Sequence, residues 1–203
     1  GRFKYSKINQ LIDRVENGIT SNITKVIIRR DMKALLNQFA QYELCFGNQF
    51  NINPAGFNIK STGFTITGTS DIAYFTDVPN KDAAGNLDGS MMGSISVVSR
   101  NNKDEQVVLI KSAGSVDYKK GEVILNTINI ASTQAANNII EIQAFPESND
   151  VVGLKDLFVS FDVSNSSINM RKDVIASGED VSGVVFTRDY FTSSYSNGVL
   201  ERK

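Results

Sequence analysis

The chain has 203 residues, a formal net charge of −1 and a hydrophobic fraction of 41%. This length can form one large domain or two small ones, and the balanced charge gives no general attraction to nucleic acid or to an anionic membrane. The chain contains no histidine, one cysteine and no tryptophan, which excludes histidine-based catalysis, Cys/His zinc sites and an internal disulfide. We therefore expect no enzyme activity, no cofactor and no bound metal.

The first predicted element is a helix over residues 7–17. Four apolar residues recur at the spacing of one helix face: Ile8, Leu11, Ile12 and Val15. Ser6 is placed to cap the start of this helix, and Gly18 is placed to end it. The chain does not begin with methionine, so we expect it to be a fragment or a processed product.

After this helix the apolar period changes to two, which predicts β-strands. The predicted strands cover residues 25–30, 41–46, 64–67, 72–76, 91–98, 106–111, 122–125, 139–144 and 157–163. In the second of these, Tyr42, Leu44 and Phe46 should share one side of the strand, opposite Cys45. The segment 106–111 is apolar on both faces and should be a central strand.

One turn is predicted by its glycine. Lys119 and Lys120 precede Gly121 between two apolar runs. This order is typical of a hairpin turn in which glycine takes the left-handed conformation.

These elements predict an α+β fold with one N-terminal helix followed by mostly antiparallel strands in two packed layers. We expect two subdomains. Residues 1–130 would hold the helix and a first β-rich subdomain, and residues 131–203 a second β-rich subdomain with an aromatic C-terminal segment. The long loop at 77–90 is an alternative place for the division.

Few residues are candidates for chemistry. Cys45 has no histidine to activate it, so we interpret it as an ordinary strand residue. The loop at 77–90 carries Asp77, Asp82 and Asp88, whose oxygens suit calcium. No glutamate closes a twelve-residue calcium loop there, which favours a solvated loop. Paired carboxylates from separate strands would suit glycoside hydrolysis, and the sequence leaves that alternative open.

An aromatic cluster near the C-terminus is the predicted interface. Its members are Phe186, Tyr190, Phe191 and Tyr195. The segment is too apolar to lie free in water, so it packs either on its own domain or on a neighbouring chain. Together with Phe158, on the outer side of strand 157–163, we expect it to form the interface of a homodimer.

Five segments carry a resemblance to a known family. They are YSKINQLI (5–12), ITKVIIRR (23–30), YELCFGNQFN (42–51), VDYKKGEV (116–123) and YSNGVL (195–200). In this order, and over roughly residues 3–200, the chain resembles the C-terminal region of the gene product six family. These are the large wedge proteins of T-even (T4-like) phage baseplates and are J-like baseplate components.

The resemblance implies a structural role in the baseplate of a contractile tail. Paired copies in this family join into a ring that holds the wedges together and changes shape in the switch that triggers sheath contraction. The implied partners are further copies of the chain, a long peripheral wedge protein and a lysozyme-like sheath initiator. The implied location is the virion, after assembly in the host cytoplasm. The alternative interpretation is a β-rich adhesin or a carbohydrate-binding module.

Overall fold

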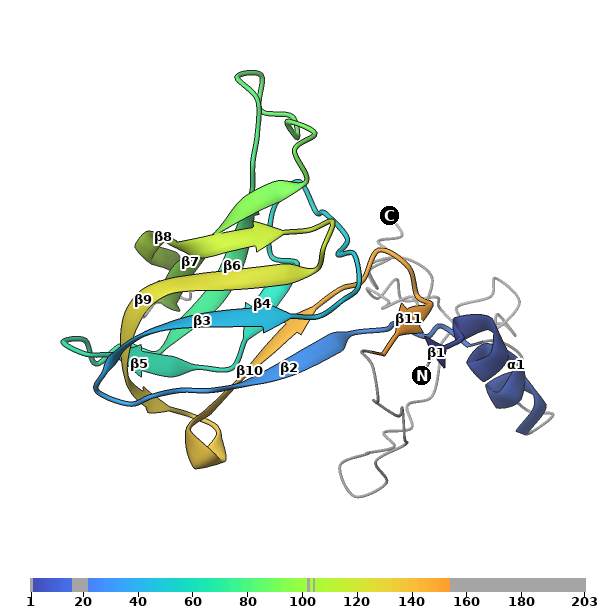
Figure 1. The fold of residues 1–203 in the computed structure, drawn as a ribbon, viewed down its shortest axis with the longest axis horizontal. Helices are drawn as coiled ribbons and strands as arrows, with labels where there is room; N and C mark the ends of the chain where they lie inside the picture. Colours follow the sequence, from blue (N-terminus) through green and yellow to red (C-terminus); the bar gives the residue numbers. More distant parts are fainter. Residues whose placement is uncertain (1, 16–21, 102, 104, 154–203) are drawn as a thin grey trace, which may run out of the picture. The chain divides into compact units, whose positions relative to one another are not determined.

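The structure, a computed structural model, describes residues 2–15, 22–101, 103 and 105–153. Figure 1 shows the elements in this part of the chain. In order they are β1 (Arg2–Phe3), α1 (Tyr5–Val15), β2 (Ile28–Lys33), β3 (Phe39–Cys45), β4 (Ile59–Ser61), β5 (Phe64–Ile66), β6 (Ala73–Pro79), β7 (Met92–Arg100), β8 (Gln106–Asp117), β9 (Glu122–Thr133), the short 3₁₀ helix η1 (Ala136–Asn138), β10 (Ile139–Ala144) and β11 (Val151–Val152).

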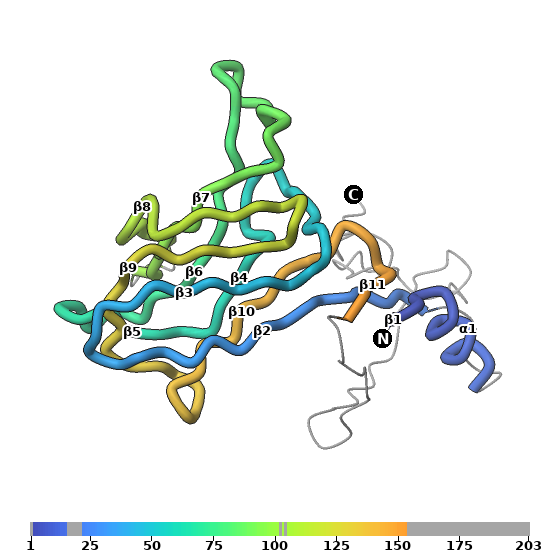
Figure 2. The backbone as a smooth tube through the Cα atoms, viewed as in Figure 1, coloured from blue at the N-terminus to red at the C-terminus, as the bar shows by residue number. Residues whose placement is uncertain are grey.

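The strands from β2 to β10 form a single nine-stranded sheet in which all neighbours are antiparallel. Part of this sheet closes on itself, because β5 pairs with β6, β6 with β7, β7 with β8, β8 with β9, and β9 again with β5. The path of the backbone through these strands can be followed in Figure 2. From β6 the sheet continues through β4 and β10 to β2, and β3 pairs with β9.

Each strand of this sheet contributes at least one apolar side chain to one continuous core. The rings of Phe64 and Phe75 stack there with centroids 4.4 Å apart. Phe46 and Phe50 meet edge to face at 5.1 Å. In β10, for example, every second residue is buried, because successive side chains of a strand point to opposite faces of the sheet.

The predicted α+β class is wrong. Helix α1 is present, but none of its residues is buried, and none belongs to the core. Its apolar residues Leu11 and Val15 remain 53% and 77% exposed. The described chain is therefore mostly β. Its strands close around the core, whereas the prediction had an N-terminal helix and strands in two packed layers.

Several individual elements follow the sequence prediction. Strand β10 has the predicted bounds, and in β3 the side chains of Tyr42 and Leu44 face inward while Cys45 is exposed. Gly121 has φ of +68° in the turn between β8 and β9, as predicted. The segment 139–144 and this turn were predictable because their signals are local.

Other predictions need correction. Helix α1 starts before Ser6, so this residue lies in its first turn and not at the cap. Strand β2 lies three residues later than predicted. Strand β8 does lie between two strands, but Val107 and Val108 are 40% and 47% exposed, so burial on both faces was wrong. The predicted strand 157–163 and Gly18 lie outside the described residues, and the division of the chain near residue 130 stays a prediction.

Candidate functional site

The predicted interface residues cannot be placed on this fold. Phe158, Phe186, Tyr190, Phe191 and Tyr195 all lie outside the described residues. Their role in a homodimer remains a prediction from the sequence.

Asp77 does not belong to the loop in which the sequence placed it. It lies within β6 and is 1% exposed. One carboxylate oxygen accepts the backbone N–H of Ile59 at 2.7 Å, and the other accepts the hydroxyl of Tyr118 at 2.7 Å. Burial raises the pKa of the Tyr118 phenol, and the charge of Asp77 adds to this effect. Asp77 thus joins β6 to β4 and to the β8–β9 turn.

The remaining loop aspartates bind the loop itself. The Asp82 carboxylate accepts the backbone N–H groups of Ala84 and Asn86, each at 2.9 Å. Asp88 accepts the hydroxyl and the backbone N–H of Ser90, and these bonds lower the pKa of its carboxyl group. Across the described ranges, no three His, Cys, Asp or Glu side chains lie together as metal ligands would. The calcium set of Asp77, Asp82 and Asp88 is therefore not brought together.

Cys45 lies at the exposed end of β3. Its carbonyl oxygen accepts the Nε–H of Arg30 at 3.1 Å. Its position agrees with the interpretation as a strand residue.

A groove of about 670 Å³ lies on the sheet where β4, β6, β7 and β8 run side by side. Strand pairing determines which residues face it. Lys60 of β4 is opposite Thr76 of β6, and Tyr74 of β6 is opposite Val98 of β7. Arg100 of β7 is opposite Gln106 of β8. All six residues line the groove, because opposed residues of an antiparallel pair point to the same side of the sheet.

The groove combines cationic, aromatic and hydroxyl groups. Lys60 and Arg100 are cationic, and no acidic residue is among the described residues that line the groove. The Lys60 ammonium group lies 5.9 Å from the centroid of the Phe145 ring, within reach of a cation–π contact. The apolar floor between the two cations is formed by Tyr74 and by Val98, which is 8% exposed.

Two features of the groove are costly for the free protein. The hydroxyl oxygen of Thr76 is buried and has no hydrogen-bond partner in the described part of the chain; such a group costs about 1–3 kcal/mol. Phe57 at the rim has φ of +67° and is 45% exposed, and bulky residues rarely adopt this conformation. Strain and unsatisfied groups of this kind gather at binding sites.

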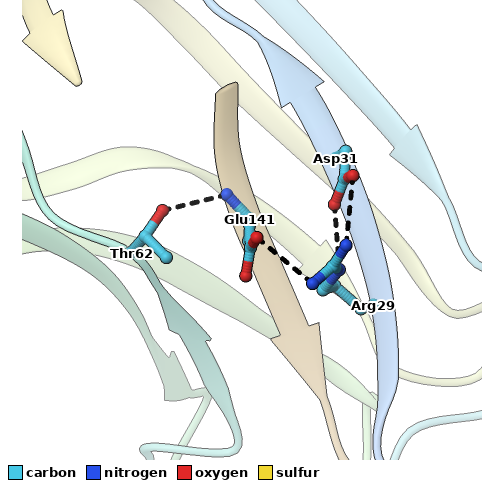
Figure 3. A network of polar contacts seen from close by, with 4 residues as sticks. All are labelled: Arg29, Asp31, Thr62 and Glu141. Carbon is cyan, nitrogen blue, oxygen red and sulfur yellow. Dashed lines mark hydrogen bonds and ion pairs between the residues drawn. The ribbon is translucent and has the colours of Figure 1, made fainter. Parts of the chain in front are cut away.

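A polar network joins β2, β10 and Thr62, the residue that follows β4 (Figure 3). Arg29 contacts Asp31 at 3.0 Å and Glu141 at 3.1 Å. Asp31 and Glu141 are thus engaged by the same guanidinium group. The Glu141 backbone N–H donates to the Thr62 hydroxyl at 3.0 Å.

Sequence reasoning missed this groove. Apart from Phe57, its residues come from four strands, and together they are spread over residues 57–106. No short motif joins them.

Comparison with protein-family models, with curated protein sequences and with solved structures finds no match to this chain. Within the ranges that the structure describes, every helix is too short or too polar to span a membrane.

Proposed function

We propose that this chain is a structural wedge component of the baseplate of a contractile phage tail. In this role it forms a ring of dimers that joins the wedges and changes shape during the switch that triggers sheath contraction. It acts in the virion, after assembly in the host cytoplasm, and it performs no catalysis. The family resemblance over residues 3–200 is the origin of this proposal.

One structural observation supports it above the others. Two segments that carry the resemblance, 42–51 and 116–123, are distant in the chain but adjacent in the fold. The backbone N–H of Phe46 donates to the carbonyl of Gly121 at 2.8 Å, and that of Phe50 donates to the carbonyl of Tyr118 at 2.7 Å. Leu44 is paired with Val123 across β3 and β9. The two segments that carry the resemblance thus form one structural unit.

Co-assembly tests the proposal. The chain would be co-expressed with a long peripheral wedge protein and a lysozyme-like sheath initiator from a T-even phage, and purified through a tag on one partner. We expect a stable complex in size-exclusion chromatography. Absence of any association with baseplate proteins would contradict the proposal.

Self-association is a separate test. The chain has a mass of 22.2 kDa, so light scattering at micromolar concentration should give twice this mass. Replacing Phe186, Phe191 and Tyr195 by serine should return the mass to that of a single chain. A monomer in the unmodified protein would contradict the dimer.

A carbohydrate-binding module is the second candidate. It is favoured by the exposed ring of Phe57 and the ring of Tyr74 in one groove, because sugars stack on exposed aromatic rings. Retention of defined glycans on an array, lost on replacing Tyr74 by alanine, would favour this function over the baseplate role.

A further inference from the structure

We propose that the groove over β4, β6, β7 and β8 binds an acidic sugar residue, a hexuronate. The sugar ring would stack on Tyr74, its carboxylate would meet the Lys60 ammonium group, and one of its hydroxyl groups would bond to the Thr76 hydroxyl. This inference rests on the second candidate function, the carbohydrate-binding module, and gives that function a ligand class. It does not depend on the baseplate role.

The buried hydroxyl of Thr76 is the strongest sign of a ligand. Thr76 lines the groove and is 5% exposed, and its hydroxyl oxygen has no hydrogen-bond partner in the described part of the chain. A sugar hydroxyl both donates and accepts hydrogen bonds, so it can pair with the threonine hydroxyl in either direction. Binding would thus remove a cost that the free protein carries.

Lys60 supplies one positive charge beside Thr76. The two residues are directly opposite each other across β4 and β6, so their side chains share one side of the sheet. Lys60 is exposed, and none of the ion pairs between described residues involves it. Arg100 also lines the groove, but it already has an interaction of its own, so its charge is not assigned to the ligand. A single cation matches the single negative charge of one carboxylate.

Tyr74 provides a ring at the right distance for one sugar. It precedes Thr76 by two residues in β6, so both side chains point to the same side and their Cα atoms are about 6.6 Å apart. Lys60 is one strand further across, about 8 Å from Tyr74 between Cα atoms. One six-membered sugar ring with its substituents covers these separations. The ring of Phe57, 45% exposed at the rim, extends the aromatic surface.

The strand pairing disfavours a peptide as the ligand. Around the groove β4 pairs with β10 and β6, β6 with β4 and β7, and β7 with β6 and β8. The groove therefore lies on the face of the sheet and not along an unpaired edge, where an extended peptide would add its backbone hydrogen bonds. Side chains alone recognise a ligand here, and their ammonium, hydroxyl and aromatic groups together suit a sugar acid.

Matched pairs of sugars test the ligand class. Titrations of the full chain followed by saturation-transfer NMR would compare galacturonate with galactose and glucuronate with glucose, because the members of each pair differ only in the carboxylate group. We expect at least one hexuronate to bind about fivefold more tightly than its neutral counterpart, the change expected for one exposed ion pair. A galacturonate trimer identifies the source: tighter binding than the monomer indicates a polysaccharide, and equal or weaker binding a free sugar acid.

Two outcomes would overturn the proposal in different ways. Equal binding within both pairs would exclude the acidic ligand but retain the carbohydrate-binding module. No binding of any of the four sugars would exclude both and leave the baseplate role untouched.

Variants at Lys60 locate the acidic group. Lys60→Gln should abolish the preference for the hexuronate and leave binding of the neutral sugar unchanged. Lys33→Gln on β2, outside the groove, is the matched control and should keep the preference. A preference that survives Lys60→Gln would overturn the proposal. Urea midpoints, measured in parallel, separate loss of binding from loss of folding.

Thr76→Val distinguishes a binding role from a structural one. Removing an unsatisfied hydroxyl should raise the urea midpoint of the free protein, while loss of its hydrogen bond to the sugar weakens binding of the hexuronate about threefold. Unchanged affinity for the hexuronate in this variant would contradict a ligand at Thr76 and overturn the proposal as stated.

Discussion

At the scale of single residues, the Asp77 carboxylate joins three parts of the fold. It is buried in β6, and it accepts hydrogen bonds from Ile59 and from the Tyr118 hydroxyl. The Asp77 carbonyl oxygen also accepts the backbone N–H of Phe57 at 3.4 Å. Such a buried carboxylate is stable only while its hydrogen-bond donors remain in place.

Tyr118→Phe should therefore destabilise the protein. It leaves one carboxylate oxygen of Asp77 without its donor, which costs about 1–3 kcal/mol in the free energy of unfolding. Tyr74→Phe is the control, since the Tyr74 hydroxyl has no hydrogen bond within the described ranges. Urea unfolding followed by circular dichroism measures both variants, and equal midpoints would contradict this role of Tyr118.

The same residue predicts a loss of stability in alkaline solution. Burial and the charge of Asp77 raise the pKa of Tyr118 in the folded state, whereas an unfolded tyrosine titrates near pH 10. Above about pH 10 the unfolded chain releases this proton and the folded chain retains it, so the free energy of unfolding falls as the pH rises. Urea midpoints between pH 9 and 11 should fall less steeply in Tyr118→Phe than in the unmodified protein. If the urea midpoints of the two proteins fell equally steeply with pH, the alkaline loss of stability could not be assigned to Tyr118.

At the scale of elements, the β8–β9 turn depends on close contact with the segment after β3. A methyl group at Gly121 would overlap the carbonyl oxygen of Asn48. Gly121→Ala should therefore lower the free energy of unfolding by about 2 kcal/mol more than Gly85→Ala. Gly85 is a matched control because its φ is also positive, at +86°, but an added Cβ there meets no atom within 4 Å. Similar losses in both variants would show that only the backbone conformation matters.

Thr62 stabilises the edge of the β10–β4 pairing through both its side chain and its backbone. Thr62 accepts the Glu141 N–H through its hydroxyl group (Figure 3). It also donates its own backbone N–H to the Glu141 carbonyl at 3.0 Å. Thr62→Val should cost about 1 kcal/mol in the free energy of unfolding, because the Glu141 N–H loses its acceptor. Arg29→Gln should cost less than this, since its ion pairs are half exposed. Thermal unfolding measures the stability loss in both variants. A larger loss in Arg29→Gln than in Thr62→Val would show that the ion pairs dominate and would contradict the prediction.

The elements that could be predicted are those with local signals. The alternation of Tyr42, Leu44 and Phe46 identified the buried side of β3, and Gly121 identified a turn. Strand β2 was displaced because the apolar run 26–28 looks like a strand, while the actual strand is determined by pairing of residues 28–33 with β10. Long-range pairing of this kind leaves no local mark in the sequence.

The candidate groove was hidden for the same reason. Lys60, Tyr74 and Arg100 line one groove only because β4, β6 and β7 are neighbours in one sheet. Asp77, by contrast, was assigned to the following loop, because β6 continues to Pro79 and the sequence pattern ends at Thr76. The chemistry of each side chain was evident from the sequence, but its neighbours were not.

At the scale of the whole molecule, helix α1 contributes no residue to the apolar core. Its apolar face is what suggested an α+β fold, yet none of its residues is buried. It is linked to the rest of the described chain by polar contacts, among them the Tyr5 N–H to Asp150 at 2.8 Å and the Tyr5 hydroxyl to the Thr24 carbonyl at 3.1 Å. The first of these contacts is exposed and the second is partly buried, and a hydrogen bond within a protein contributes only about 0.5–1.5 kcal/mol to stability.

A chain that starts at residue 22 should therefore retain its β fold. It loses α1 and the short β1–β11 pairing, but it keeps every residue of the apolar core. Because burial of apolar surface is the main stabilising contribution, we expect the free energy of unfolding to change by less than about 1 kcal/mol. Urea unfolding of the truncated and full chains, with near-ultraviolet circular dichroism as a probe of aromatic packing, measures this. A loss comparable to that of a core substitution, about 3 kcal/mol, would mean that the apolar face of α1 is covered in solution and contributes to folding.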